Sequence, residues 1–171
     1  MKKLVLFGLL GLLGHNMTYA QKVITIAKDT KVYEAPQARD EYAAQNSNGD
    51  NVILKEGMCF EVKEEKGGWY VIEYTNGLRG NVMQNTVVSP DAVKMPTAGK
   101  YTVNNSPSQS STLSKVGDDW SLTVGSKNLK GKTSSNVILF QNEDGSLAYS
   151  LTMLNGKPYL FCYDNSVTHF F

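Results

Sequence analysis

Short apolar runs separated by glycine turns fill the segment between residues 52 and 82. Phe60 and Val62 alternate with charged residues, and a second alternating run from Trp69 to Tyr74 follows the turn at Gly67-Gly68. Alternation with a period of two is typical of a strand with one buried face, and glycine supplies the positive φ that tight turns need. The segment therefore predicts strands joined by short turns, as in a small twisted β-barrel.

Four local patterns follow one another in this part of the chain. They are Thr30 to Pro36, a run that ends in proline; Leu54-Lys55-Glu56-Gly57 followed by Phe60 and Val62; Gly68-Trp69-Tyr70-Val71; and the turn and strand from Asn76 to Val82. In this order they resemble the bacterial SH3-like (SH3b) domain over roughly Val23 to Val88. The resemblance implies a ligand of the peptidoglycan or peptide class. The chain departs from the family in its longer loop between Pro36 and Val52, and at Asn81, where these domains commonly carry an aromatic residue.

The N-terminus has the features of an export signal. Met1-Lys2-Lys3 is cationic, Leu4 to Leu13 is apolar, and Thr18-Tyr19-Ala20 offers small residues for cleavage. The apolar run is shorter than the roughly 20 residues that a membrane-spanning helix needs. We therefore predict a signal peptide over residues 1–20, no transmembrane span, and a secreted chain in the periplasm or at the cell surface.

The remaining chain is predicted to form two domains. Residues 89–99 contain Pro90 and Pro96 among small residues without an apolar period, which indicates a linker between an SH3b-like domain (21–88) and a C-terminal antiparallel domain (100–171).

Antiparallel strands are expected in the second half as well. Residues 146–153 alternate apolar side chains with small or hydroxylated ones, and Asn155-Gly156 is a strong hairpin signal. Further strands are predicted at 101–103, 120–124, 137–140, 157–163 and 167–171, and a serine-rich loop at 104–112. The expected fold class is all-β: a small SH3-like barrel followed by a second small antiparallel β-meander or barrel-like domain.

Composition argues against several classes of function. The formal net charge of +1 falls to about −1 once Lys2 and Lys3 leave with the signal peptide, and acids and bases are mixed along the chain. Nucleic-acid binding needs a basic stripe, so we expect no nucleic-acid partner. One remaining histidine and two distant cysteines do not make a zinc set, so no metal site and no cofactor are predicted.

Cys162 and His169 are the one pair that could serve a cysteine hydrolase. A nucleophilic cysteine needs a neighbouring cation or a helix N-terminus, and the apolar strand around Cys162 offers neither. We therefore predict no catalytic residues and no enzymatic activity.

Aromatic residues of the first half supply the predicted binding surface. Tyr70, Ile72 and Tyr74 are assigned to the barrel core, which leaves Trp69 on the opposite face, where it would flank a groove with Tyr33. The predicted ligand-binding residues are Tyr33, Tyr42, Trp69 and Asn81.

The two cysteines leave two alternatives open. Cys59 points away from a core that takes Phe60 and Val62, so it could form a disulfide with Cys162, or both thiols could be buried and unpaired. In either case Cys59 is expected near the surface between the two domains.

The favoured function is an exported, non-catalytic binding or scaffolding module of the cell envelope, with peptidoglycan or a peptide as its ligand. An alternative is an accessory protein of an envelope complex that binds another protein and no small ligand. A cysteine hydrolase is the third and least favoured hypothesis.

Overall fold

The computed structural model describes residues 22–75 and 77–163, and these residues form an all-β protein, which confirms the predicted fold class. The segment predicted to be a signal peptide, His169 and the strand expected at 167–171 lie outside the described residues. In the described part of the chain, helical structure is limited to short 3-10 turns, and no helix has the length and apolar character needed to cross a membrane.

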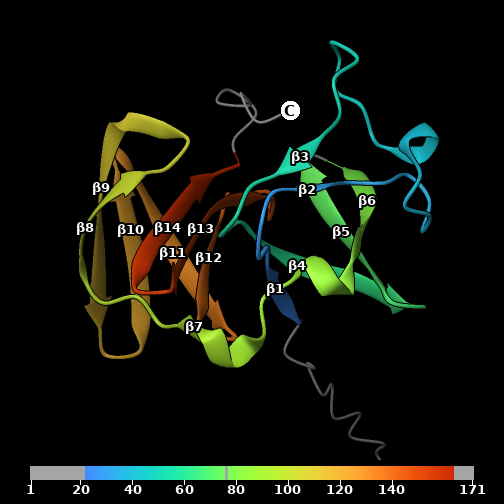
Figure 1. Ribbon diagram of the computed structural model, residues 1–171. Coiled ribbons are helices and arrows are strands. Elements are labelled where there is room, and N and C mark those ends of the chain that lie inside the picture. Colours follow the sequence, from blue (N-terminus) through green and yellow to red (C-terminus); the bar gives the residue numbers. More distant parts are fainter. Residues whose placement is uncertain (1–21, 76, 164–171) are drawn as a thin grey trace, which may run out of the picture.

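The first half builds a small sheet system at the right of Figure 1. Its main sheet has the order β1-β4-β5-β6, and β2 pairs with β3 beside it. The elements are β1 (Val23–Thr25), β2 (Thr30–Lys31), η1 (Asp40–Tyr42), β3 (Ile53–Leu54), β4 (Cys59–Lys66), β5 (Trp69–Thr75), β6 (Leu78–Met83) and η2 (Gln84–Thr86).

Alternation in β5 explains how this half is packed. Tyr70, Ile72 and Tyr74 are at most 9% exposed and pack with Phe60 and Leu54, while their neighbours in sequence are half-buried. The face of β5 that was predicted to fill the core is thereby confirmed. The β4–β5 turn uses Gly67 and Gly68 at φ values of 58° and 84°, which favour glycine.

The second half is one curled antiparallel sheet of consecutive strands, seen at the left of Figure 1. Its path runs from β14 back to β8, and β7 pairs with β13. The elements are η3 (Pro90–Ala92), β7 (Val93–Lys94), β8 (Gly99–Val103), β9 (Ser106–Val116), β10 (Asp119–Val124), β11 (Lys127–Ser134), β12 (Val137–Gln141), β13 (Leu147–Leu154) and β14 (Lys157–Cys162).

Two asparagines that follow β8 join it to β14. The Asn104 amide donates to the Leu160 carbonyl (2.7 Å), and the Asn105 side chain both accepts from the Cys162 amide (3.0 Å) and donates to its carbonyl (2.9 Å). The two ends of the sheet therefore meet, and its inner face encloses a core that includes Trp120, Leu122 and Phe140.

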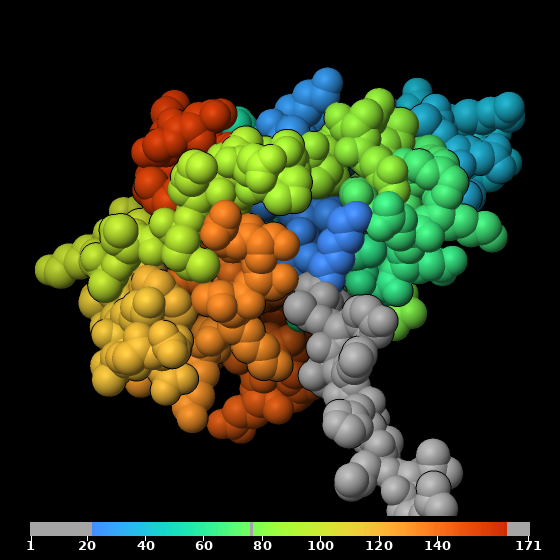
Figure 2. All heavy atoms as spheres, turned by 90° about the horizontal axis from the view of Figure 1, so that it is seen from below, coloured from blue at the N-terminus to red at the C-terminus, as the bar shows by residue number. Residues whose placement is uncertain are grey.

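The outer face of β12–β14 is covered by the first half. Val137 and Leu139 of β12 cluster with Val23, Cys59 and Val93. Phe161 and Tyr163 belong to the core cluster of the first half, where the ring of Tyr163 meets Phe60 edge-on at 5.3 Å. Figure 2 shows the blue N-terminal strand between the green first half and the orange second half. The two halves thus share buried apolar contacts.

Two local predictions for the second half are wrong. The segment 104–112, predicted to be a loop, lies mostly in β9, because pairing with both β8 and β10 overrides the low strand preference of serine. The strand at 146–153 is not half-buried: Ser150 and Thr152, on its polar face, have 0% exposure.

The predicted linker 89–99 contains η3 and β7, and β7 pairs with β13.

Candidate functional site

A groove of about 370 Å³ lies on the outer face of the β4–β5–β6 sheet. The strand register arranges this face in two rows across the three strands. One row is Lys66, Trp69 and Met83, and the next is Glu64, Val71 and Asn81. The groove is lined by Pro36, Glu64, Lys66, Gly67, Trp69, Val71 and Asn81.

Trp69 is the main apolar side chain of the groove, and Tyr33 holds its ring in place. The two rings are perpendicular, with 5.7 Å between their centroids and an angle of 84° between their planes. Tyr33 is 8% exposed, so it supports Trp69 from below and offers little surface of its own. Such edge-to-face pairs contribute about 0.5–1.5 kcal/mol beyond the area that they bury.

Asn81 is fixed by the chain that carries Tyr33. Its side-chain Nδ2 donates to the carbonyls of Tyr33 (3.1 Å) and Glu34 (3.2 Å), while the backbones of Asn81 and Tyr33 exchange hydrogen bonds of 2.7 and 2.9 Å. An amide with both donors engaged in this way presents its Oδ1 as an acceptor. The groove can therefore accept a hydrogen bond at a defined point.

Pro36, at the start of the long loop, lines the groove. The Glu34 amide donates to the Tyr42 carbonyl (2.8 Å), and Lys31 pairs with Asp40 (2.6 Å), so the loop is tied back to the strand that precedes it. Tyr42 is not among the groove-lining residues; its backbone fastens the loop. Of the four predicted ligand-binding residues, the structure thus brings Trp69 and Asn81 into the groove and places Tyr33 beneath it.

Glu64, Lys66, Val71 and Pro36 line the groove and were not predicted. The signal for Val71 was present, because it shares a face with Trp69. The positions of Glu64 and Lys66 depend on an irregularity in β4 that alternation does not show, namely a register shift between Val62 and Glu64.

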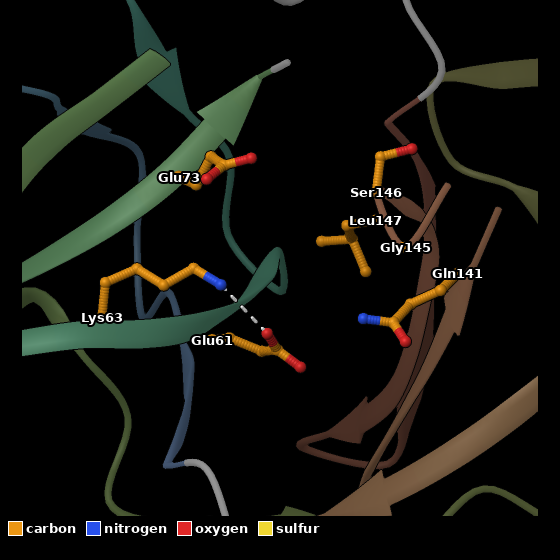
Figure 3. A pocket seen from close by; sticks show the side chains of 7 residues that line it. All are labelled: Glu61, Lys63, Glu73, Gln141, Gly145, Ser146 and Leu147. Carbon is orange, nitrogen blue, oxygen red and sulfur yellow. Dashed lines mark hydrogen bonds and ion pairs between the residues drawn. The ribbon is translucent and has the colours of Figure 1, made fainter. Parts of the chain in front are cut away.

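A second, smaller cavity lies between the two halves (Figure 3). Glu61, Lys63 and Glu73 of the first half face the strand ends and turn of β12–β13 across a volume of about 50 Å³. Lys63 and Glu61, which both line this cavity, form an ion pair with 3.2 Å between Lys63 Nζ and Glu61 Oε2. This volume suits a few water molecules and not a larger ligand.

The two cysteines are free and buried. Cys59 has 0% exposure at the contact between the halves, where its Sγ lies 3.3 Å from Thr25 Oγ1 and donates to the Gly57 carbonyl (3.4 Å). Burial raises the pKa of the Cys59 thiol to about 12. Cys162 faces the inner core of the second sheet with 0% exposure. In the described residues, no three His, Cys, Asp or Glu side chains are grouped to hold a metal.

The raised pKa of Cys59 predicts a loss of stability in alkali. The folded state keeps the thiol protonated to about pH 12, whereas the unfolded thiol ionises near its ordinary value of 9.0. The contribution of this thiol to the free energy of unfolding is therefore fully present below pH 9 and is lost as the pH rises from 9 towards 12. Denaturant titrations of the wild type should show a loss of about 2 kcal/mol near pH 10.5 that a Cys59→Ala variant lacks. Equal pH dependence in the two proteins would contradict the burial of this thiol.

Comparisons of the chain with protein-family models, with curated proteins and with solved structures returned no match.

Proposed function

We propose that the chain is an exported, non-catalytic binding module of the cell envelope, and that the groove beside Trp69 takes a peptide or a peptidoglycan strand. The observation that carries this proposal is a half-buried tryptophan, fixed edge-on by Tyr33, in a groove of about 370 Å³. That volume lies at the lower end of the range for small-ligand sites, about 300–1,000 Å³.

The rigidity of the groove supports a role in binding. Trp69 is held by Tyr33, Asn81 by two carbonyls, and the Pro36 loop by backbone hydrogen bonds and an ion pair. Side chains that are already fixed lose little conformational entropy when a ligand arrives. A flat aromatic face beside a fixed acceptor suits an extended chain with amide or hydroxyl donors, as peptides and peptidoglycan have.

The chemistry of the groove supports a non-catalytic role. Among the described residues its lining includes no serine, cysteine or histidine, so it lacks the hydroxyl or thiol nucleophile and the imidazole base of a hydrolase triad. Cys59 is buried away from the groove at the contact between the two halves, and its raised pKa disfavours the thiolate that nucleophilic chemistry needs.

Replacing Trp69 with alanine tests this proposal. We expect the dissociation constant for purified peptidoglycan, measured by co-sedimentation, to rise about 30-fold, since truncating a central tryptophan costs about 2 kcal/mol or more. The loss in the free energy of unfolding should be smaller than the loss in the free energy of binding, because Trp69 is only half-buried in the folded protein. Thermal unfolding measures it.

Leu78→Ala is the matched control, because Leu78 lies on β6 outside the groove and is 55% exposed. It should leave binding unchanged. Binding that Trp69→Ala does not weaken would exclude the groove, and binding only to an envelope protein, without peptidoglycan or peptide, would favour the accessory role.

A further inference from the structure

Two charged side chains in the groove differ from all those around them. On β4 and β5, Glu61 pairs with Lys63, Glu65 with Lys22, and Glu73 with Arg79. Glu64 and Lys66, which line the groove, take part in no ion pair among the described residues. The groove therefore presents one carboxylate and one ammonium group that form no ion pair with the described residues.

A β-bulge aims these two side chains at the groove. Val62 faces the core opposite Ile72, and strict alternation would turn Glu64 and Lys66 inward as well. The register shift between Val62 and Glu64 exchanges the inward and outward positions for the residues that follow it. Glu64 therefore lies opposite Val71, and Lys66 lies opposite Trp69, on the outer face. Bulges commonly redirect side chains next to functional sites.

The spacing of the two charges matches that of an extended peptide. Glu64 and Lys66 are two residues apart on one face of a strand, so their Cα atoms are separated by about 6.5–7 Å. Side chains at positions i and i+2 of an extended ligand repeat at the same distance. Such a ligand, lying along the floor made by Trp69 and Val71, can place a cationic group on Glu64 and a carboxylate on Lys66.

On the basis of the function proposed above, we propose that the groove selects an extended peptide with a cationic and an acidic side chain two residues apart. The cation pairs with Glu64 beside Val71, and the carboxylate pairs with Lys66 beside Trp69. Asn81 Oδ1 accepts a backbone N–H from the opposite side of the ligand. Charge pairs at a partly exposed site contribute more to selectivity than to affinity, because water competes for each partner.

Blocked pentapeptides test this selectivity, because acetylated and amidated ends leave only side-chain charges. The probes are Ala-Lys-Ala-Glu-Ala, Ala-Gln-Ala-Gln-Ala, Ala-Glu-Ala-Glu-Ala, and Lys-Ala-Ala-Glu-Ala, in which the charges are three apart and fall on opposite sides of an extended chain. Binding is followed by NMR at the indole N–H of Trp69, and the buried indole of Trp120 is the internal control. The wild type should bind Ala-Lys-Ala-Glu-Ala about tenfold more tightly than the other three.

Substitutions in the groove should change this order in a defined way. Glu64→Gln and Lys66→Gln should each reduce the preference several-fold, and Glu64→Lys, which gives two cations, should transfer it to Ala-Glu-Ala-Glu-Ala. Lys63→Gln is the control, since Lys63 pairs with Glu61 outside the groove, and it should keep the wild-type order.

The outcomes separate this inference from the function on which it rests. Binding of peptidoglycan or peptides that requires Trp69 but ignores the charges at positions 64 and 66 would overturn the inference and leave the proposed function standing. Absence of any binding that depends on Trp69 would overturn both. A preference that follows the charges in wild type and Glu64→Lys would establish the inference.

Discussion

Replacing Gly57 with alanine is expected to destabilise the protein by about 3–5 kcal/mol and to lower its thermal midpoint by roughly 10 °C. Gly57 has a φ of +83°, which costs a side-chain-bearing residue about 1–2 kcal/mol. An added Cβ would also overlap the ring carbons Cγ and Cδ1 of Tyr159 and lie 2.7 Å from its Cβ. Gly57 belongs to the first half and Tyr159 to β14, so the loss measures close packing between the halves.

Gly68→Ala is the matched control for this substitution. Gly68 has a φ of +84°, and a Cβ there would meet nothing within 4 Å, so the variant should lose only the backbone contribution of about 1–2 kcal/mol. A Tyr159→Ala background removes the ring carbons Cγ and Cδ1 but keeps the Cβ at 2.7 Å, so the cost of Gly57→Ala should fall there by about 1–2 kcal/mol towards that of Gly68→Ala. An undiminished cost in that background would mean that Tyr159 does not pack on Gly57.

Much of the fold can be predicted from the sequence where one face of a strand is apolar. The alternation of Tyr70, Ile72 and Tyr74 identifies β5 and its buried face, and Asn155-Gly156 places the β13–β14 turn. The signal is weak in β9, where serines pair with strands on both sides. Alternation is also weak in β11, because glycine occupies the inward position 131. A Cβ there would come within 2.6 Å of Ile138, so the packing excludes the larger apolar residue that would mark a buried face.

Contacts between distant segments could not be predicted from local patterns. Small polar residues on β13 indicate a solvated face, yet Ser150 and Thr152 are buried, and Ser150 lies against the Tyr163 hydroxyl where this strand approaches Cys59 of the first half. Their small side chains allow the close approach. Cys59 lies at this contact, but the sequence left open whether it is paired or free.

The candidate site was predicted in part for a similar reason. Alternation predicts that Trp69 lies on the face opposite the core, whereas Tyr33, which was predicted to flank the groove with it, is buried beneath the Trp69 ring. Glu64 and Lys66 could not be placed, because one extra residue in β4 reverses which face every later side chain occupies. Tyr42 was predicted as part of an aromatic set, but it is not among the residues that line the groove.

The hydroxyl group of Tyr163, which follows β14, forms buried hydrogen bonds to Cys59 of the first half. It donates to the Cys59 carbonyl (3.1 Å), accepts from the Cys59 amide (2.9 Å) and lies 2.8 Å from Ser150 Oγ. All three residues are at most 7% exposed, and burial raises the pKa of Tyr163 well above its ordinary value. One hydroxyl thus satisfies both peptide groups of a buried strand residue.

Tyr163→Phe is therefore expected to destabilise the protein by about 3 kcal/mol, because it leaves the buried N–H and C=O groups of Cys59 without this partner. Tyr101→Phe is the control, since that hydroxyl donates only to the exposed Thr97 carbonyl (2.6 Å), and it should cost less than about 1 kcal/mol. Denaturant titration gives both values, and hydrogen exchange should show faster exchange of the Cys59 amide in Tyr163→Phe. Equal stability of the two variants, with the Cys59 amide still protected, would show that the hydroxyl does not hold the halves together.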